Sequence, residues 1–278
     1  MRVTGWVLAV AAVSGLAAPA VQGQGQDGPY KVLSTNKVGG EGGFDYVYAD
    51  AVGRRLYVPR LGPAGAVAVY DLDSLKQVGS IATTTSHGVA VDQASHHGFS
   101  SGKPVVMWDS KTLAVIKTID VQGGPDGIMG DAFNGRVYVF SHSAPNATVI
   151  DAKDGSIVGT IDLGGAPEQA ASDGKIVEAL PIGKGTDGAV FNPKTMEAFS
   201  SQGDGTLTVI KEESPAKFAV EQNLATISRG KTLTLDAKTG KVLVIGAEYG
   251  PAPAAAPGEK PARPPMVPGS FSILVIGK

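Results

Sequence analysis

The chain contains no cysteine among its 278 residues. This absence excludes disulfide bonds, thiolate zinc sites, cysteine nucleophiles and covalently attached c-type haem. Charged residues are also scarce, at 18% of the chain, and the formal net charge is −2. Because a slightly acidic chain has no overall attraction for nucleic acid or anionic lipid, we do not expect nucleic acid to be the partner. One alternative stays open, a local basic patch formed by Arg60, Arg229, Lys231 and Lys260.

One apolar run stands near the N-terminus, between Trp6 and Ala18. It is short for a membrane span and is followed by small residues, a pattern typical of a secretory signal peptide. We expect a signal peptide over residues 1–23, a linker over 24–29 and one domain over 30–278. The protein would then be periplasmic or secreted, with no transmembrane segment in the mature chain.

Sustained helical periodicity is absent, and the chain carries a repeat instead. A nine-residue phrase that ends in Asp or Asn, with a polar or charged residue five positions earlier, occurs six times. The copies are GGFDYVYAD (42–50), TTSHGVAVD (84–92), GGPDGIMGD (123–131), GAPEQAASD (165–173), KGTDGAVFN (184–192) and SRGKTLTLD (228–236). Most copies are followed by three more β-rich runs separated by turn residues, in cycles of about 40 residues. Four short antiparallel strands per cycle are typical of one propeller blade, so the sequence predicts an all-β propeller.

Two irregular units bear on how the ring closes. The last unit ends at FSILVIGK (271–278), a third strand with no fourth after it, whereas YKVLSTNKVGG (30–40) precedes the first unit as an extra strand. We expect these segments to pair in one blade, because pairing removes two exposed sheet edges. In the unit at 166–185, a first strand runs directly into a fourth strand. The prediction is therefore five full four-stranded units plus one truncated hybrid unit.

Several phrases of the repeat are distinctive. They are GRRLYVPR (53–60), GRVYVFSH (135–142), VIDAKDGSIVGTIDLGG (149–165), GDGTLTVI (203–210) and the C-terminal segment 248–277. These phrases resemble those of the YVTN-repeat, or YncE-like, β-propellers, a group of exported bacterial proteins. Members of that group usually have seven blades, so the resemblance implies that this chain lacks part of the usual ring. It implies a fold more specifically than an activity, because propellers host many unrelated functions.

The repeat also aligns one residue per unit where the first strand begins. First strands line the central channel of a propeller, so the aligned residues would gather at its mouth. They are Asp45, His87, Asp126, Glu168, Asp187 and Lys231. Acids clustered with an imidazole suit a polar ligand or a divalent cation such as Ca²⁺, Mg²⁺ or Zn²⁺. The candidate metal ligands are Asp45, His87, Asp126 and Asp187. The alternative is ordinary turn chemistry, in which the acids cap backbone N–H groups.

A proline-rich loop over 248–270 should emerge on the same face, either as a lid or docking arm or as an exposed insertion. Second-rank candidates on this face are Arg60, His142, Arg229, Tyr249, Lys260 and Arg263. At the opposite face, the residue that ends each nine-residue phrase begins a hairpin and is expected to be structural. These residues are Asp50, Asp92, Asp131, Asp173, Asn192 and Asp236.

The sequence contains no nucleophile elbow, no H-E-x-x-H metal motif and no P-loop. We therefore expect a monomeric binding or scaffold protein, not an enzyme, that recognises a small molecule or a protein through the channel-mouth face. The alternative is a metal-dependent, lactonase-like hydrolase with an axial metal ion and His87 as general base. The ion would be held by Asp45, Asp126, Glu168 and Asp187.

Overall fold

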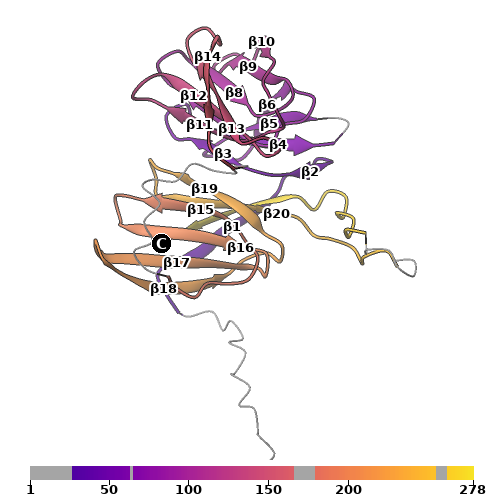
Figure 1. Ribbon diagram of the computed structural model, residues 1–278. Helices are drawn as coiled ribbons and strands as arrows, with labels where there is room; N and C mark the ends of the chain where they lie inside the picture. Colours follow the sequence, from indigo (N-terminus) through magenta and orange to yellow (C-terminus); the bar gives the residue numbers. More distant parts are fainter. Residues whose placement is uncertain (1–26, 63–64, 166–178, 255–261) are drawn as a thin grey trace, which may run out of the picture.

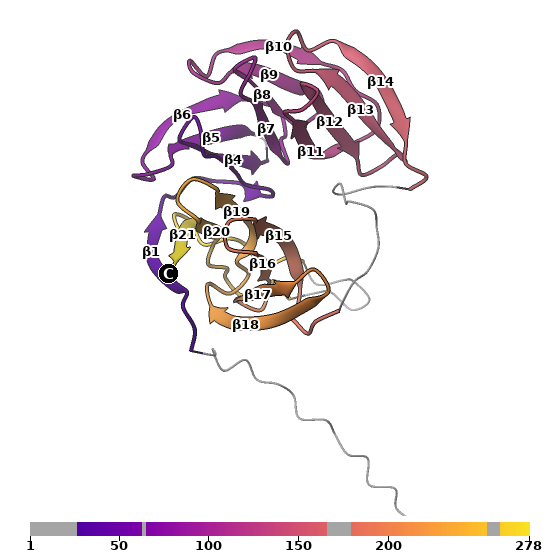
Figure 2. The ribbon, with the colours of Figure 1, turned by 90° about the vertical axis from the view of Figure 1, so that its left-hand side faces the viewer.

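The computed structural model describes residues 27–62, 65–165, 179–254 and 262–278. Every regular element in these ranges is a β-strand, so they contain no helix that could span a membrane. The strands form five antiparallel sheets around a common centre (Figure 1, Figure 2). The predicted all-β propeller is confirmed, with five blades, which we number in chain order.

Blades 1 to 3 come from the N-terminal half of the chain. Blade 1 contains β2 (Gly43–Phe44), β3 (Tyr48–Asp50), β4 (Arg55–Leu61), β5 (Ala66–Asp71) and β6 (Gln77–Ala82). Blade 2 contains β7 (Val89–Asp92), β8 (His97–Ser100), β9 (Val105–Asp109) and β10 (Val115–Ile119). Blade 3 contains β11 (Pro125–Asp131), β12 (Arg136–Ser141), β13 (Asn146–Asp151) and β14 (Ile157–Asp162). Figure 2 shows β7 and β11 toward the centre of the ring, with β6, β10 and β14 at its rim.

Blades 4 and 5 complete the set, and blade 5 combines both ends of the domain. Blade 4 contains β15 (Thr186–Asn192), β16 (Glu197–Gln202), β17 (Thr206–Ser214) and β18 (Lys217–Ala225). Blade 5 contains β19 (Lys231–Asp236), β20 (Lys241–Gly246), β21 (Ser272–Gly277) and β1 (Lys31–Lys37). β1 pairs antiparallel with β21, from Lys31 opposite Gly277 to Lys37 opposite Ser272. The predicted closure by the N-terminal strand is therefore confirmed.

The residue that ends each innermost strand starts the next hairpin through its side chain. Asp50 Oδ1 accepts the backbone N–H of Gly53 at 2.8 Å, and Asp92 Oδ2 accepts that of Ser95 at 2.7 Å. Asp131, Asn192 and Asp236 each accept a backbone N–H two residues further on. This is the turn chemistry that the sequence predicted at these positions. Asp173 lies outside the described residues.

The first strand of blade 1 is interrupted, which the sequence did not predict. The phrase GGFDYVYAD forms two short strands, β2 and β3, and Asp45 lies in the break between them. In this break the backbone N–H of Tyr46 donates to the carbonyl of His87 in blade 2 at 3.1 Å. The chain leaves its own sheet there and bonds to the neighbouring blade, which brings Asp45 close to His87.

Buried apolar side chains join neighbouring blades in four places. One cluster joins blades 5 and 1, a second joins 1 and 2, a third joins 2 and 3, and a fourth joins 4 and 5. Among the described residues, no such cluster joins blades 3 and 4. Ile161 of blade 3 and Phe191 of blade 4 remain 42% and 45% exposed. Most of the truncated unit, residues 166–178, lies outside the described residues, and 179–185 contain no strand.

Candidate functional site

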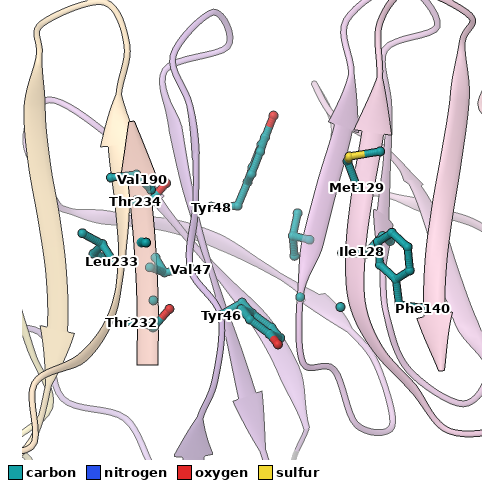
Figure 3. Close-up of a pocket in the computed structure, with 15 residues that line it drawn as sticks. Tyr46, Val47, Tyr48, Ile128, Met129, Phe140, Val190, Thr232, Leu233 and Thr234 are labelled. Carbon is teal, nitrogen blue, oxygen red and sulfur yellow. The ribbon is translucent and has the colours of Figure 1, made fainter. Parts of the chain in front are cut away.

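A channel of about 260 Å³ lies at the centre of the ring and is lined by the first strands of all five blades. The stretches from the first strands are Tyr46–Tyr48, Gly88–Val89, Gly127–Met129, Gly188–Val190 and Thr232–Thr234, and Phe140 of β12 completes the lining. Each stretch begins one residue after a predicted mouth residue, so positions that align in sequence are equivalent in space. Figure 3 shows Tyr46 and Tyr48 between Leu233 on one side of the pocket and Ile128 on the other.

Blades 1, 2 and 3 bring two carboxylates and two imidazoles together at the mouth. His87 Nδ1 lies 2.9 Å from Asp45 Oδ2 and 3.6 Å from Asp126 Oδ1. His142 follows β12, and its Nδ1 lies 3.5 Å from Asp126 Oδ2. The hydrogen bond with Asp45 raises the pKa of His87 against the opposite effect of partial burial, and the negative charges of Asp126 and Asp45 add to the increase. The side chains of Asp45, His87 and Asp126 are 24%, 29% and 16% exposed to solvent, so the cluster is accessible from the mouth.

Blades 4 and 5 and the proline-rich loop supply mainly basic residues to the same mouth. A cavity of about 660 Å³ opens there, with Asp45 and His87 in its lining. The other ionisable and aromatic lining residues are Phe44, Asp187, Arg229, Lys231, Tyr249 and Arg263. Lys231 Nζ lies 3.1 Å from Asp187 Oδ1. The Arg229 guanidinium lies 5.1 Å from the ring centroid of Tyr249, a cation–π contact.

The proline-rich loop covers one edge of this cavity. Tyr249 and Met266 form an antiparallel bridge across the loop, and Arg263, Pro264 and Met266 line the cavity. The prediction that the loop emerges on the channel-mouth face is therefore confirmed. Its role as a lid or docking arm stays a prediction, and Lys260 lies outside the described residues.

Backbone strain accompanies the basic part of the mouth. Arg229 and Thr232 have φ angles of 57° and 52°, in the left-handed region. Thr232 is β-branched and 3% exposed, and it lies at the irregular pairing between Lys231 and Leu233 in β19. Left-handed conformations are rare for β-branched residues and occur where the surrounding structure enforces them. The bulge in β19 therefore sets the position from which the neighbouring Lys231 reaches the mouth.

Arg60 does not line this cavity, although the neighbouring Leu61 does. Arg60 is 7% exposed, and its guanidinium donates to the carbonyls of Glu41 and Gly42 at 3.1 and 3.2 Å. It also lies 4.1 Å from the ring centroid of Phe271. The glycine-rich turn before the broken first strand folds over Arg60, so this side chain adds no surface charge. The basic patch considered from the sequence therefore lacks one member.

The other predicted site residues fall into two groups. The structure brings Asp45, His87, Asp126 and His142 into one cluster, and Asp187, Lys231, Arg229, Tyr249 and Arg263 into the cavity beside it. Glu168 lies outside the described residues. Tyr46 and Tyr48 line the channel but were missed by the sequence analysis. The sequence does mark Tyr46 as unusual, because three of the aligned units carry glycine at the position directly after the mouth residue, where this unit carries a large aromatic residue.

Comparisons with known proteins define the fold and no more. No protein-family model matches the chain, and no curated protein matches its sequence. The solved structure of U3-55K is similar at 9% sequence identity and a TM-score of 0.62, over 88% of this chain and 98% of that one. The structure of the RRP9 WD40 repeats is similar at 9% identity and a TM-score of 0.62, over 91% and 100% of the two chains. The chain therefore belongs to the structural class of β-propellers.

Proposed function

We propose that this protein binds a small ligand in the cavity at the channel mouth. The carrying observation is the convergence of ionisable side chains of both signs, from several blades and the proline-rich loop, on one cavity of about 660 Å³. Small-molecule sites are concave and occupy roughly 300–1,000 Å³, with a few polar groups that fix the ligand's orientation. The size of the cavity therefore favours a small molecule over a protein partner.

A ligand screen tests this proposal. Chemically diverse acids, bases and neutral molecules are added to the purified chain, and the unfolding temperature is recorded, because a ligand of the folded state raises it. A true mouth ligand should lose most of its effect in Arg263→Gln. Its effect should be unchanged in the control Lys153→Gln, at the opposite end of blade 3. A hit that responds equally to both substitutions would place binding elsewhere and contradict the proposal.

We propose also that the protein is an exported member of the YVTN-repeat, or YncE-like, group. The support is the signal-like pattern over residues 1–23 and the repeated phrases of the propeller. Expression in a secreting bacterial host tests export. The mass of the recovered chain should correspond to cleavage after Ala20 or Gly23. A full-length chain that stays in the cytoplasm would refute export while leaving ligand binding untouched.

A metal-dependent hydrolase is the second candidate function. It is favoured by the approach of His87 to both Asp45 and Asp126, because ionised carboxylates beside an imidazole can hold a metal ion that activates water. Hydrolysis of simple lactones and esters should then require a divalent ion and should fall at least tenfold in Asp126→Asn. Equal rates in the presence of a chelator would exclude this function.

A further inference from the structure

We infer that the channel mouth binds a divalent transition-metal ion together with an anionic ligand that completes the coordination of the ion. This inference rests on the proposed ligand-binding function and names the chemistry of the ligand. Asp45, His87 and Asp126 hold the ion. Arg229, Lys231 and Arg263 hold the carboxylate or phosphate group of the ligand.

The ion-binding half rests on the positions of three donor atoms. One donor atom each from Asp45, His87 and Asp126 lies within 4.8 Å of the other two. Two donors on opposite sides of an ion with bonds of about 2.0–2.2 Å are about 4.0–4.4 Å apart, so small side-chain rotations suffice. The three donors come from three different blades, and a packed cluster joins each neighbouring pair of these blades. The ligands are therefore carried on a fixed frame.

The chemistry of the donors selects the class of ion. An imidazole suits borderline ions such as Zn²⁺, and carboxylates also suit the harder transition-metal ion Mn²⁺, whereas Ca²⁺ and Mg²⁺ favour all-oxygen sites. His142 Nδ1, at 3.5 Å from Asp126 Oδ2, adds a second imidazole at the edge of the site. Asp187 was a predicted metal ligand, but its carboxylate pairs with Lys231 at 3.1 Å. We therefore assign Asp187 to positioning that lysine.

The anion-binding half rests on charge. The chain as a whole carries a net charge of −2, yet the described residues of blades 4 and 5 and of the loop present three cations and one acid to the cavity. Lys231 pairs with Asp187, whereas Arg229 and Arg263 form no ion pair with another described residue. A guanidinium can bind a carboxylate or a phosphate through two parallel hydrogen bonds. Two available guanidinium groups at one cavity therefore favour a ligand with an anionic group.

The two halves depend on each other through the cavity that they share. Asp45 and His87 line the same cavity as the three cations. Three protein ligands leave coordination positions open on a metal ion, and an anionic oxygen can occupy one of them. Without the ion, the carboxylates of Asp45 and Asp126 would repel such an anion. The ion should therefore strengthen anion binding, and the anion should strengthen ion binding by the same factor.

Ion binding is tested on the purified full chain after treatment with a chelator. Mn²⁺ is added, and the free ion is measured by its electron paramagnetic resonance signal. We expect one bound ion per chain and at least a tenfold loss of affinity in Asp126→Asn and His87→Gln. Asp131→Asn, at the other end of β11, and His96→Gln, in an exposed turn, should bind as the unaltered chain does. Binding equal in all five proteins, or no binding, would overturn the inference.

Anion binding is tested by calorimetry with malonate, a dicarboxylate, and with inorganic phosphate, each with and without Mn²⁺. We expect Mn²⁺ to tighten the binding of at least one anion fivefold or more. Arg263→Gln and Arg229→Gln should remove this gain and leave one Mn²⁺ per chain. Anion affinities that are the same with and without Mn²⁺ would refute the coupling. A screening hit that binds at the mouth in excess chelator would also refute it, but would support the proposed ligand-binding function.

Discussion

A buried glutamate in blade 4 holds the start of β1 and the end of β21, the two outer strands of blade 5, and its substitution should weaken the whole ring. Glu197 is fully buried and accepts hydrogen bonds from the Tyr30 hydroxyl, just before β1, and from Lys278 Nζ, just after β21, at 2.8 Å. Lys278 Nζ also lies 5.0 Å from the ring centroid of Tyr30. We predict that Glu197→Gln lowers the free energy of unfolding by about 1–2 kcal/mol at pH 7.

The magnitude follows from the environment of the carboxyl. Burial alone would raise the pKa of Glu197, but the hydrogen bonds from Lys278 and Tyr30, together with the positive charge of Lys278, outweigh it and lower the pKa from 4.5 to about 2. That difference corresponds to about 3 kcal/mol at neutral pH. Two effects reduce it. Lys278 is half exposed, so solvent screens its charge. Burial raises the pKa of the neighbouring Glu221, and repulsion by Glu197 raises it further.

The sign of the pH dependence follows from the same values. The pKa of Glu197 is lower in the folded state, so its stabilisation is present above pH 4.5 and is lost as the pH falls toward 2. Urea unfolding, followed by the fluorescence of the buried Trp108, should therefore show a shallower loss of stability between pH 5 and pH 3 in Glu197→Gln. Glu248→Gln is the control, because it breaks an exposed ion pair with Lys37 and should change stability by less than about 0.5 kcal/mol. If Glu197→Gln and Glu248→Gln were equally stable at every pH, the proposed stabilisation of blade 5 by Glu197 would be refuted.

Two further predictions concern backbone and packing. Thr232→Asn should raise stability by up to about 1 kcal/mol in thermal unfolding, because Asn tolerates the left-handed φ of 52° better than a β-branched residue does. Thr234→Asn in the same strand should lower stability, since Thr234 Oγ1 accepts the N–H of Ala49 at 3.1 Å. A gain of stability in both variants, or in neither, would contradict the strain at Thr232. Gly98→Ala should cost about 1–3 kcal/mol and alter Trp108 fluorescence, because a Cβ there would overlap the indole ring. Gly159→Ala, with no heavy atom within 4 Å of the added carbon, should be neutral, and equal losses in the two alanine variants would show that packing against Trp108 is not the cause.

The repeat predicted most of the fold because strand length and turn chemistry are local properties. The same period placed Asp45, His87 and Asp126 at equivalent positions, and the structure brings them into one cluster. The sequence could not predict that Arg60 would be buried against Phe271, because that contact depends on the angle between blades 1 and 5. It also could not predict the bulge at Thr232, since a change of register depends on the pairing partner as well as on the strand itself.

The four packed seams connect the blades in the order 3, 2, 1, 5, 4 within the described part of the chain. Among the described residues, these seams form an open series whose two end blades are 3 and 4. If each seam rotates slightly, the rotations add along the series, so the largest displacement occurs between blades 3 and 4. Asp126 lies in blade 3 and Asp187 in blade 4. Slight rotations at the four seams would thus change the width of the channel mouth while every hydrophobic cluster stays intact.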